Sequence, residues 1–183
     1  GWGTPADQIG KLPLEVCETI NGSWGFNLQD RKHKSKEKLI QYLVNAAGYG
    51  SNFLLNVGPM PNGKIQENHQ RSLKQIGSWL KKYGETIYGT KKGPISPNNR
   101  FVSTQKGNKV FIHLFDDKTK FLHIEDFPFQ IKNIVGFENK KVLGFKKSRY
   151  GLTIDLSKLK MNKIDNIIQI NLNMKFLLGM KPL

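Results

Sequence analysis

Acid–base chemistry near the start of the chain could come from two carboxylates, Glu15 and Glu18, which lie three positions apart. Such a pair can pass protons to and from a substrate. An arbitrary pair of carboxylates is more often solvated or ion-paired, so the two residues alone leave both interpretations open. Cys17 lies between them without a matching histidine that would activate a thiol. We therefore expect Cys17 to be a small buried residue rather than a nucleophile.

The turn-rich segment from Gly58 to Gly63 does not predict a phosphate site. Pro59 and Pro61 lack the backbone N–H groups that a phosphate-binding loop supplies. A single cysteine among 183 residues excludes an internal disulfide framework and a multi-cysteine zinc site. We expect no metal and no cofactor.

The formal net charge of +15, from 29 Lys and Arg against 14 Asp and Glu, suggests a nucleic-acid partner at first sight. Only four of these cations are arginine, the residue best suited to bidentate contacts with bases and phosphates. The lysines are spread along the chain and do not alternate with aromatic residues. We therefore expect a lysine-rich surface and no nucleic-acid partner. No stretch approaches the roughly 20 apolar residues that cross a bilayer, so we expect no membrane span.

Hydrophobic spacing predicts α/β structure in the first part of the chain. Apolar residues recur at helical intervals after Ser35, a good helix N-cap, and the helix should stop at Gly48 or Gly50. The nearly continuous apolar run 52–57 fits a strand that is buried on both faces, as in a parallel sheet.

A second helix follows the loop after this strand and ends near Gly84. We expect Trp79, on this helix, to pack rather than to act chemically. Helix, buried strand, loop and helix form the repeat unit of an α/β protein. The apolar stripe of the second helix consists of Leu73, Ile76, Leu80 and Tyr83.

Beyond a linker at about residues 86–99 the pattern changes to all-β. Short apolar segments alternate with turn signals, a spacing that is typical of an antiparallel sandwich. The predicted strands are 101–104, 110–115, 121–125, 131–135, 142–145, 152–156 and 167–172.

Four short motifs occur in order along the first half. They are Gly3-Thr4-Pro5, Glu-Thr-Ile-Asn-Gly-Ser-Trp-Gly-Phe-Asn at 18–27, Asn-Phe-Leu-Leu-Asn-Val-Gly-Pro at 52–59, and Ile87-Tyr88-Gly89-Thr90. Each alone is weak, but their order and spacing resemble the later part of the α-L-fucosidases of glycoside hydrolase family 29. The second half agrees with the C-terminal sandwich of that family in position and pattern more than in sequence.

The resemblance implies an α/β part followed by an all-β part. Residues 1–90 would form the last units of a (β/α)8-like catalytic barrel, and residues 91–183 a C-terminal antiparallel β-sandwich. It also implies retaining hydrolysis of terminal α-L-fucose from fucosylated glycans, by two carboxyl groups about 5 to 5.5 Å apart and without a metal.

The nucleophile of this family is an Asp upstream of the region that the chain resembles. A (β/α)8 barrel needs about 250 residues. We therefore expect the chain to act with the remainder of the barrel, in the same polypeptide or in another chain, and to be inactive alone. Members of the family are typically secreted, periplasmic or lysosomal, and the sequence itself leaves the compartment open.

The acid/base of the family is a Glu that often follows a segment similar to Gly3-Thr4-Pro5. Here that position holds Ala6, whose methyl group cannot transfer a proton. Either the chain is an inactive version, or the role falls to Asp7 or, as the fallback, to Glu15. The resemblance also places Trp24 beside the fucose ring and its C5 methyl group, where an aromatic face suits an apolar patch. The alternative for Trp24 is a packed loop residue.

Asn56 could orient the floor of the same site or cap the following loop. A function of a different class stays open beside the enzyme: a non-catalytic carbohydrate-binding or scaffold protein derived from this family. Binding of fucose without turnover of an aryl α-L-fucoside would favour that alternative.

Overall fold

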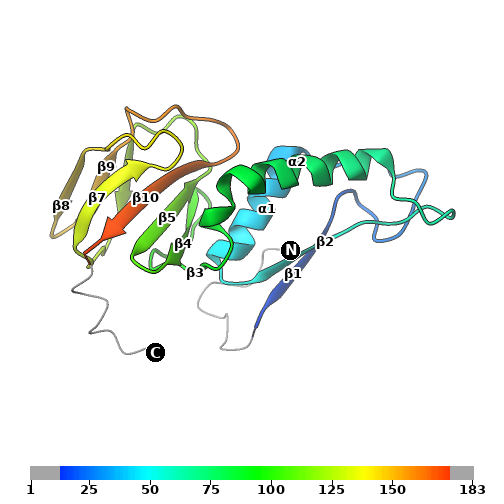
Figure 1. The fold of residues 1–183 in the computed structure, drawn as a ribbon, viewed down its shortest axis with the longest axis horizontal. Helices are drawn as coiled ribbons and strands as arrows, with labels where there is room; N and C mark the ends of the chain where they lie inside the picture. The colour runs from blue at the N-terminus through cyan, green and yellow to red at the C-terminus, as the bar shows by residue number, and fades with distance from the viewer. Residues whose placement is uncertain (1–12, 174–183) are drawn as a thin grey trace. The chain divides into compact units, whose positions relative to one another are not determined.

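The structure of the chain is a computed structural model that describes residues 13–173. The chain divides into two compact units, and the boundary in the sequence lies between Tyr88 and Gly89. Figure 1 follows the elements in chain order, from the blue strand β1 to the red strand β10. No helix in residues 13–173 combines the length and the apolar content that a bilayer crossing requires.

In its described part, residues 13–88, the first unit has two parallel strands and two α-helices. Strand β1 (Glu15–Thr19) pairs with β2 (Asn52–Asn56), and helix α1 (Lys36–Gly48) connects them. Helix α1 contacts both β2 and the following helix α2 (Glu67–Tyr83), which ends in a 3-10 turn, η2 (Gly84–Thr86). The order of strand, helix, strand and helix is that of an α/β unit.

Helix α1 begins where the sequence predicts. The Ser35 hydroxyl accepts a hydrogen bond from the Lys38 backbone N–H at 3.3 Å, which satisfies one of the free donors at the helix start. The buried face of α1 includes Leu39, Ile40 and Val44. These side chains recur at helical spacing, so one stripe of the helix is removed from water.

Helix α2 buries Ile76 and Trp79. The Trp79 ring lies 5.2 Å from the Tyr83 ring, centroid to centroid. Trp79 is therefore a packing residue, as the sequence indicates. Leu73, at the edge of the predicted stripe, is 37% exposed.

The two-stranded sheet differs from the prediction in its burial. The parallel pairing is present, but the run 52–57 is not buried on both faces, because Leu54 is 42% exposed. Cys17, the partner of Leu54 across the sheet, is exposed as well, which corrects the expectation of a buried cysteine. Within the described residues, helix α1 covers the other face of β2, which carries Phe53 and Leu55.

Over residues 89–173, the second unit contains two antiparallel sheets. The first has five strands in the order β3-β4-β5-β10-β7, and the second has three strands in the order β6-β9-β8. The strands are β3 (Lys91–Lys92), β4 (Phe101–Lys106), β5 (Lys109–Leu114), β6 (Phe121–Ile124), β7 (Ile131–Gly136), β8 (Phe145–Ser148), β9 (Gly151–Asp155) and β10 (Asn166–Leu172).

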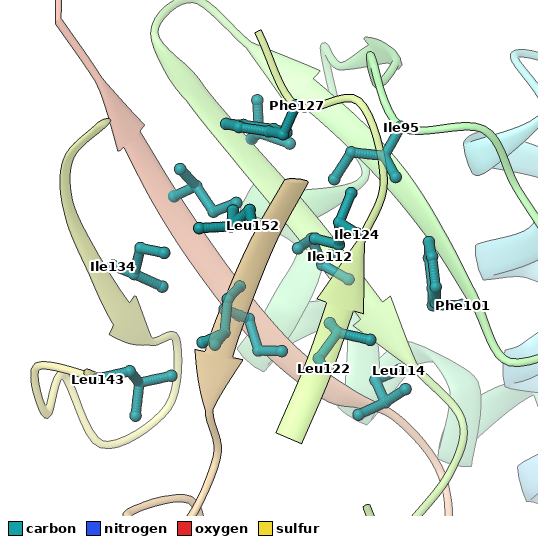
Figure 2. Close-up of a cluster of buried hydrophobic side chains, with 14 of the residues drawn as sticks. Ile95, Phe101, Ile112, Leu114, Leu122, Ile124, Phe127, Ile134, Leu143 and Leu152 are labelled. Carbon is teal, nitrogen blue, oxygen red and sulfur yellow. The ribbon is translucent and has the colours of Figure 1, made fainter. Parts of the chain in front are cut away.

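Side chains from both sheets form one hydrophobic core. Figure 2 shows Ile112 of the first sheet close to Leu122, Ile124 and Leu152 of the second. Residues 110, 112 and 114 alternate along β5, so they point to the same face of the strand. The two sheets therefore pack on each other as a sandwich.

The predicted strand 142–145 is displaced in the structure. Val142 makes only an isolated bridge to Val135, and β8 begins at Phe145. Leu143 is buried in the core, and Phe145 is the first of these residues to pair with β9, opposite Ile154. The apolar pattern marks the residues that enter the core, but the β8 pairing starts only after Gly144.

Candidate functional site

The carboxyl ends of β1 and β2 form the candidate site of the first unit. Because the two strands are parallel, the loops that follow them leave the sheet at the same end. Ligands of α/β folds bind at this end of the strands. The loop after β1, residues 20–35, carries Trp24, whose side chain is 59% exposed. A large aromatic face is thus open to solvent at the end of the sheet where a ligand is expected.

The loop after β1 is anchored to the end of β2. The side-chain amide of Asn56 donates a hydrogen bond of 2.6 Å to the backbone oxygen of Trp24. Two residues later, Gly58 lies so close to the loop that a Cβ atom there would be 2.4 Å from the carbonyl carbon of Gly25 and 2.6 Å from the amide nitrogen of Phe26. The contact requires glycine, because any side chain would push the Trp24 segment away.

The two ends of the same loop are joined by Lys34. Its ammonium donates hydrogen bonds of 2.8 Å to the backbone oxygens of Thr19 and Asn21. It also lies 3.2 Å from the Glu18 carboxylate, and the Lys34 backbone N–H donates to the Ile20 oxygen at 2.8 Å. The Lys34 side chain is only 19% exposed. The loop therefore closes on itself at the end of β1.

Asp30 stabilises the turn just before Trp24. Its carboxylate accepts hydrogen bonds from the Gly22 backbone N–H at 2.7 Å and from the Ser23 hydroxyl at 2.9 Å. The bond from Ser23, together with the backbone N–H groups of Gly22 and Lys32, lowers the pKa of Asp30 below its ordinary value. Asp30 is therefore ionised at neutral pH and acts as an acceptor that fixes the loop, not as a general acid.

Glu18 is likewise held in its ionised form. Burial alone would raise its pKa, but the Thr19 backbone N–H and the Lys34 ammonium outweigh that effect, and the pKa lies below the ordinary value. A glycosidase general acid needs a raised pKa so that it carries a proton at working pH. The environment of Glu18 is thus that of a structural ion pair.

Glu15 and Glu18, which the sequence suggests as a pair, point to opposite faces of β1, because side chains alternate along a strand. Glu15 shares its face with Cys17, whose thiol lies 3.8 Å from the Glu15 carboxylate. Glu15 also begins β1, whereas Trp24 follows its end. Four residues at about 3.3 Å each put the Glu15 backbone about 13 Å from the carboxyl end of the strand. The structure does not bring Glu15 to the Trp24 loop.

Two histidines lie together between the Trp24 loop and helix α2. The rings of His33 and His69 are 5.2 Å apart, centroid to centroid, and nearly perpendicular. His69 is 1% exposed, and neither of its ring nitrogens has a hydrogen-bond partner within the described residues. Burial, together with the neighbouring His33, lowers the pKa of His69, and the Asp30 carboxylate opposes this shift. His69 is therefore neutral at neutral pH.

Ala6 and Asp7, the other predicted positions for the acid/base, lie outside the described residues. Within residues 13–173, no group of three or more His, Cys, Asp or Glu side chains is arranged to hold a metal ion.

Sequence reasoning missed the roles of Lys34, Asp30 and Gly58. Lys34 belongs to a run of basic residues, a pattern that predicts an exposed surface. Its hydrogen bonds to two backbone oxygens cannot be recognised from the sequence. Of these three roles, only that of Gly58 could have been inferred from the sequence, because a glycine in or next to a strand often marks the close approach of another backbone.

Comparisons with known proteins show which proteins the chain is similar to. The sequence model of the family described as "Alpha-L-fucosidase" matches residues 3–85, which include β1, the Trp24 loop, β2 and α2. Plasma α-L-fucosidase of Pongo abelii is 29% identical over 165 residues, which are 82% of this chain and 35% of that protein. α-L-Fucosidase of Dictyostelium discoideum is 36% identical over 97 residues, 49% of this chain and 21% of that protein.

Solved structures give the same result. The α-fucosidase of Thermotoga maritima in complex with fucose matches 92% of this chain and 43% of its own, with a TM-score of 0.79 and 28% identity. α-L-Fucosidase isoenzyme 1 of Paenibacillus thiaminolyticus matches 88% of this chain and 40% of its own, with a TM-score of 0.78 and 25% identity. The chain thus spans well under half the length of these relatives. The chain is similar to the α-L-fucosidases, and it resembles the C-terminal portion of these proteins.

Proposed function

We propose that the chain forms the C-terminal part of a retaining α-L-fucosidase that removes terminal α-L-fucose from glycans, and that Trp24 contacts the sugar. The observation that carries the proposal is the presentation of Trp24. The indole is 59% exposed at the carboxyl end of parallel strands, while its backbone is anchored by Asn56 and the turn before it by Asp30. An exposed aromatic ring on a fixed loop offers its face to the apolar side of a deoxy sugar at little cost in entropy.

The rest of the catalytic barrel is the partner that the proposal requires, in the same polypeptide or in another chain. Within the described part of the first unit, β1 and β2 pair only with each other. One face of this sheet leaves Cys17 and Leu54 exposed, and a two-stranded parallel sheet has unpaired edges that a soluble protein normally covers. In this proposal residues 1–90 are the last barrel units, residues 91–183 are an accessory sandwich, and the nucleophile comes from the partner.

The proposal also requires an acid/base residue. Ala6 cannot fill the role, and Glu18 is ionised by its contacts with Thr19 and Lys34. Glu15 is the fallback, although its place at the start of β1 would require access from the far end of the strand. Substitution of Glu15 by Gln in the assembled enzyme tests it. A general acid would lose activity toward poor leaving groups about 100-fold or more, whereas a bystander would not.

The experiment that tests the proposal measures sugar binding and turnover together. The chain is titrated with L-fucose, and the heat of binding is measured by calorimetry in the native sequence and in Trp24→Ala. Hydrolysis of 4-nitrophenyl α-L-fucoside is measured on the same samples, with and without the upstream barrel. Loss of fucose binding in Trp24→Ala, with hydrolysis only when the barrel is present, supports the proposal. Binding without hydrolysis in the assembled protein favours a non-catalytic carbohydrate-binding role instead.

A further inference from the structure

Lys34 is placed to control the loop that presents Trp24. Its ammonium has three N–H donors, and it is surrounded by oxygen atoms at the end of β1. They are the backbone oxygens of Thr19 and Asn21 at 2.8 Å, the Thr19 hydroxyl at 3.2 Å and the Glu18 carboxylate at 3.2 Å. The acceptors therefore lie in different directions around the nitrogen. A compact ammonium can donate hydrogen bonds in these directions, whereas the donors of a guanidinium lie in one plane.

The two backbone oxygens that Lys34 contacts belong to buried residues. Thr19 is 4% exposed and Asn21 is 3% exposed, so water cannot easily replace the ammonium. A buried carbonyl oxygen without a donor costs about 1 to 3 kcal/mol. The Asn21 oxygen also accepts a hydrogen bond from the Thr19 hydroxyl, so the path of the chain from Thr19 into the loop depends on Lys34 together with that bond.

A continuous set of contacts leads from Lys34 to Trp24. Lys34 fixes the carbonyl group of Asn21, the next residue donates its backbone N–H to Asp30, and Ser23 donates its hydroxyl to the same carboxylate. Trp24 follows directly. Its own oxygen is held by Asn56 from the neighbouring strand. A change of the Lys34 side chain therefore weakens the start of the loop, while the backbone bond from Lys34 to Ile20, the bond from the Thr19 hydroxyl to Asn21 and the bond from Asn56 remain.

We infer that Lys34 is a positioning residue for sugar binding: it sets the place of Trp24 through the carbonyl oxygens of Thr19 and Asn21. The inference rests on the proposed function, in which Trp24 contacts fucose. It does not make Lys34 a catalytic residue, because its ammonium is committed to the loop and is largely buried.

The test uses the full chain labelled with 5-fluorotryptophan. The chain has three tryptophans, so the ¹⁹F spectrum has one resonance for each, and Trp24→Phe and Trp79→Phe assign two of them. Lys34→Met keeps the length of the side chain and removes its donors, and Lys34→Arg keeps the charge without the geometry. Lys32→Met is the matched control, because it removes one exposed cation from the same loop.

The expected result in the absence of sugar is a shifted or broadened Trp24 resonance in both Lys34 variants, with the Trp79 resonance unchanged. Lys32→Met should leave both signals in place. A Trp24 signal that stays unchanged in Lys34→Met and Lys34→Arg overturns the inference. So does an equal change at Trp79 in both variants, because Lys34 would then support the whole unit rather than the loop.

A fucose titration of the same samples separates this inference from the proposed function. We expect the Trp24 signal of the native chain to move with fucose, and the dissociation constant to rise about tenfold in Lys34→Met. If fucose moves no signal in the native chain or in the assembled enzyme, the sugar-binding role of Trp24 fails. The sugar-free spectra then still decide whether Lys34 positions the loop. An unchanged dissociation constant in Lys34→Met, despite a displaced Trp24, contradicts the role in sugar binding.

Discussion

The side-chain amide of Asn56 donates a 2.6 Å hydrogen bond to the backbone oxygen of Trp24, across 32 residues of sequence. Asn56 ends β2, and Trp24 lies in the loop that follows β1. The bond therefore joins the carboxyl ends of two neighbouring parallel strands, where ligands of α/β folds bind. This hydrogen bond connects the backbone of Trp24, which carries the exposed indole, to the end of the sheet.

Replacement of Asn56 by Leu should remove the hydrogen bond to Trp24. Leu has a similar volume but no donor, so we expect the unfolding free energy of the first unit to fall by about 1 kcal/mol and the Trp24 side chain to become more mobile. Urea unfolding followed by tryptophan fluorescence measures the first effect, since every tryptophan of the chain precedes residue 89. Asn52→Leu, at the other end of β2, is the control. Equal losses in both variants would contradict a specific role for the bond.

Gly58 tests the close approach of the two loops. Gly58→Ala would place a methyl group 2.4 Å from the Gly25 carbonyl carbon, against backbone that cannot move freely. We expect a loss of about 2 to 4 kcal/mol in the stability of the first unit, with a displaced Trp24 signal. Gly25→Ala is a matched control on the opposite side of the contact, because a Cβ atom there meets nothing within 4 Å. A Gly58→Ala variant as stable as Gly25→Ala would show that the loops do not touch in solution.

His69 should make the first unit sensitive to acid. Its folded-state pKa is lowered by burial and by His33, so the unfolded chain takes up the proton first as pH falls. Stability from this residue is complete above the ordinary histidine pKa of 6.5 and decreases as pH drops from there through the folded-state pKa. In His69→Phe the loss of stability between pH 7 and pH 5 should be smaller.

The measurement for His69 is urea unfolding at a series of pH values, followed by tryptophan fluorescence. The control is His123→Gln, which changes an exposed histidine of the second unit. If His69→Phe and the native chain lose stability in parallel over this range, the burial of a neutral His69 does not contribute.

The second unit contains a buried polar pair that should be important for its stability. His113 Nδ1 and Asp165 Oδ2 are 2.7 Å apart, and both side chains are fully buried. Asp165→Ala leaves the imidazole without this partner, so we expect a loss of about 3 kcal/mol. Far-UV circular dichroism reports it as a lower melting temperature of the β-rich transition. Asp117→Ala, in the turn after β5, should change that temperature little; equal effects would refute the special role of the pair.

Helices and most strands could be predicted because their signals are local. Ser35 marks the start of α1 through its side-chain hydroxyl, Gly84 follows the last residue of α2, and turn residues separate the strands of the sandwich. Strand β1 was not predicted. Its sequence, Glu-Val-Cys-Glu-Thr, has little apolar content, and it forms only because β2, more than 30 residues later, pairs with it. Such pairing is a property of the tertiary structure.

The residues of the candidate site also differ in whether local sequence or tertiary structure determines their place. The motif predicts that Trp24 contacts the sugar, which stays a prediction; the structure shows that its side chain is exposed in the loop after β1. The pairing of Glu15 with Glu18 rested on sequence distance alone, and strand alternation separates them. Lys34 could not be predicted, because its acceptors are backbone oxygens that converge only when the loop closes.

In the proposed function, this chain completes a fucosidase active site together with the upstream barrel. The most direct measurement is the hydrolysis of 4-nitrophenyl α-L-fucoside by the chain alone, by the upstream barrel segment of a family member alone, and by the two co-expressed and purified as a complex. The prediction is hydrolysis by the complex only, and its loss by about 100-fold or more when Trp24 is replaced by Ala. Hydrolysis by the chain alone, or a stable complex that neither binds fucose nor hydrolyses the fucoside, would contradict the claim.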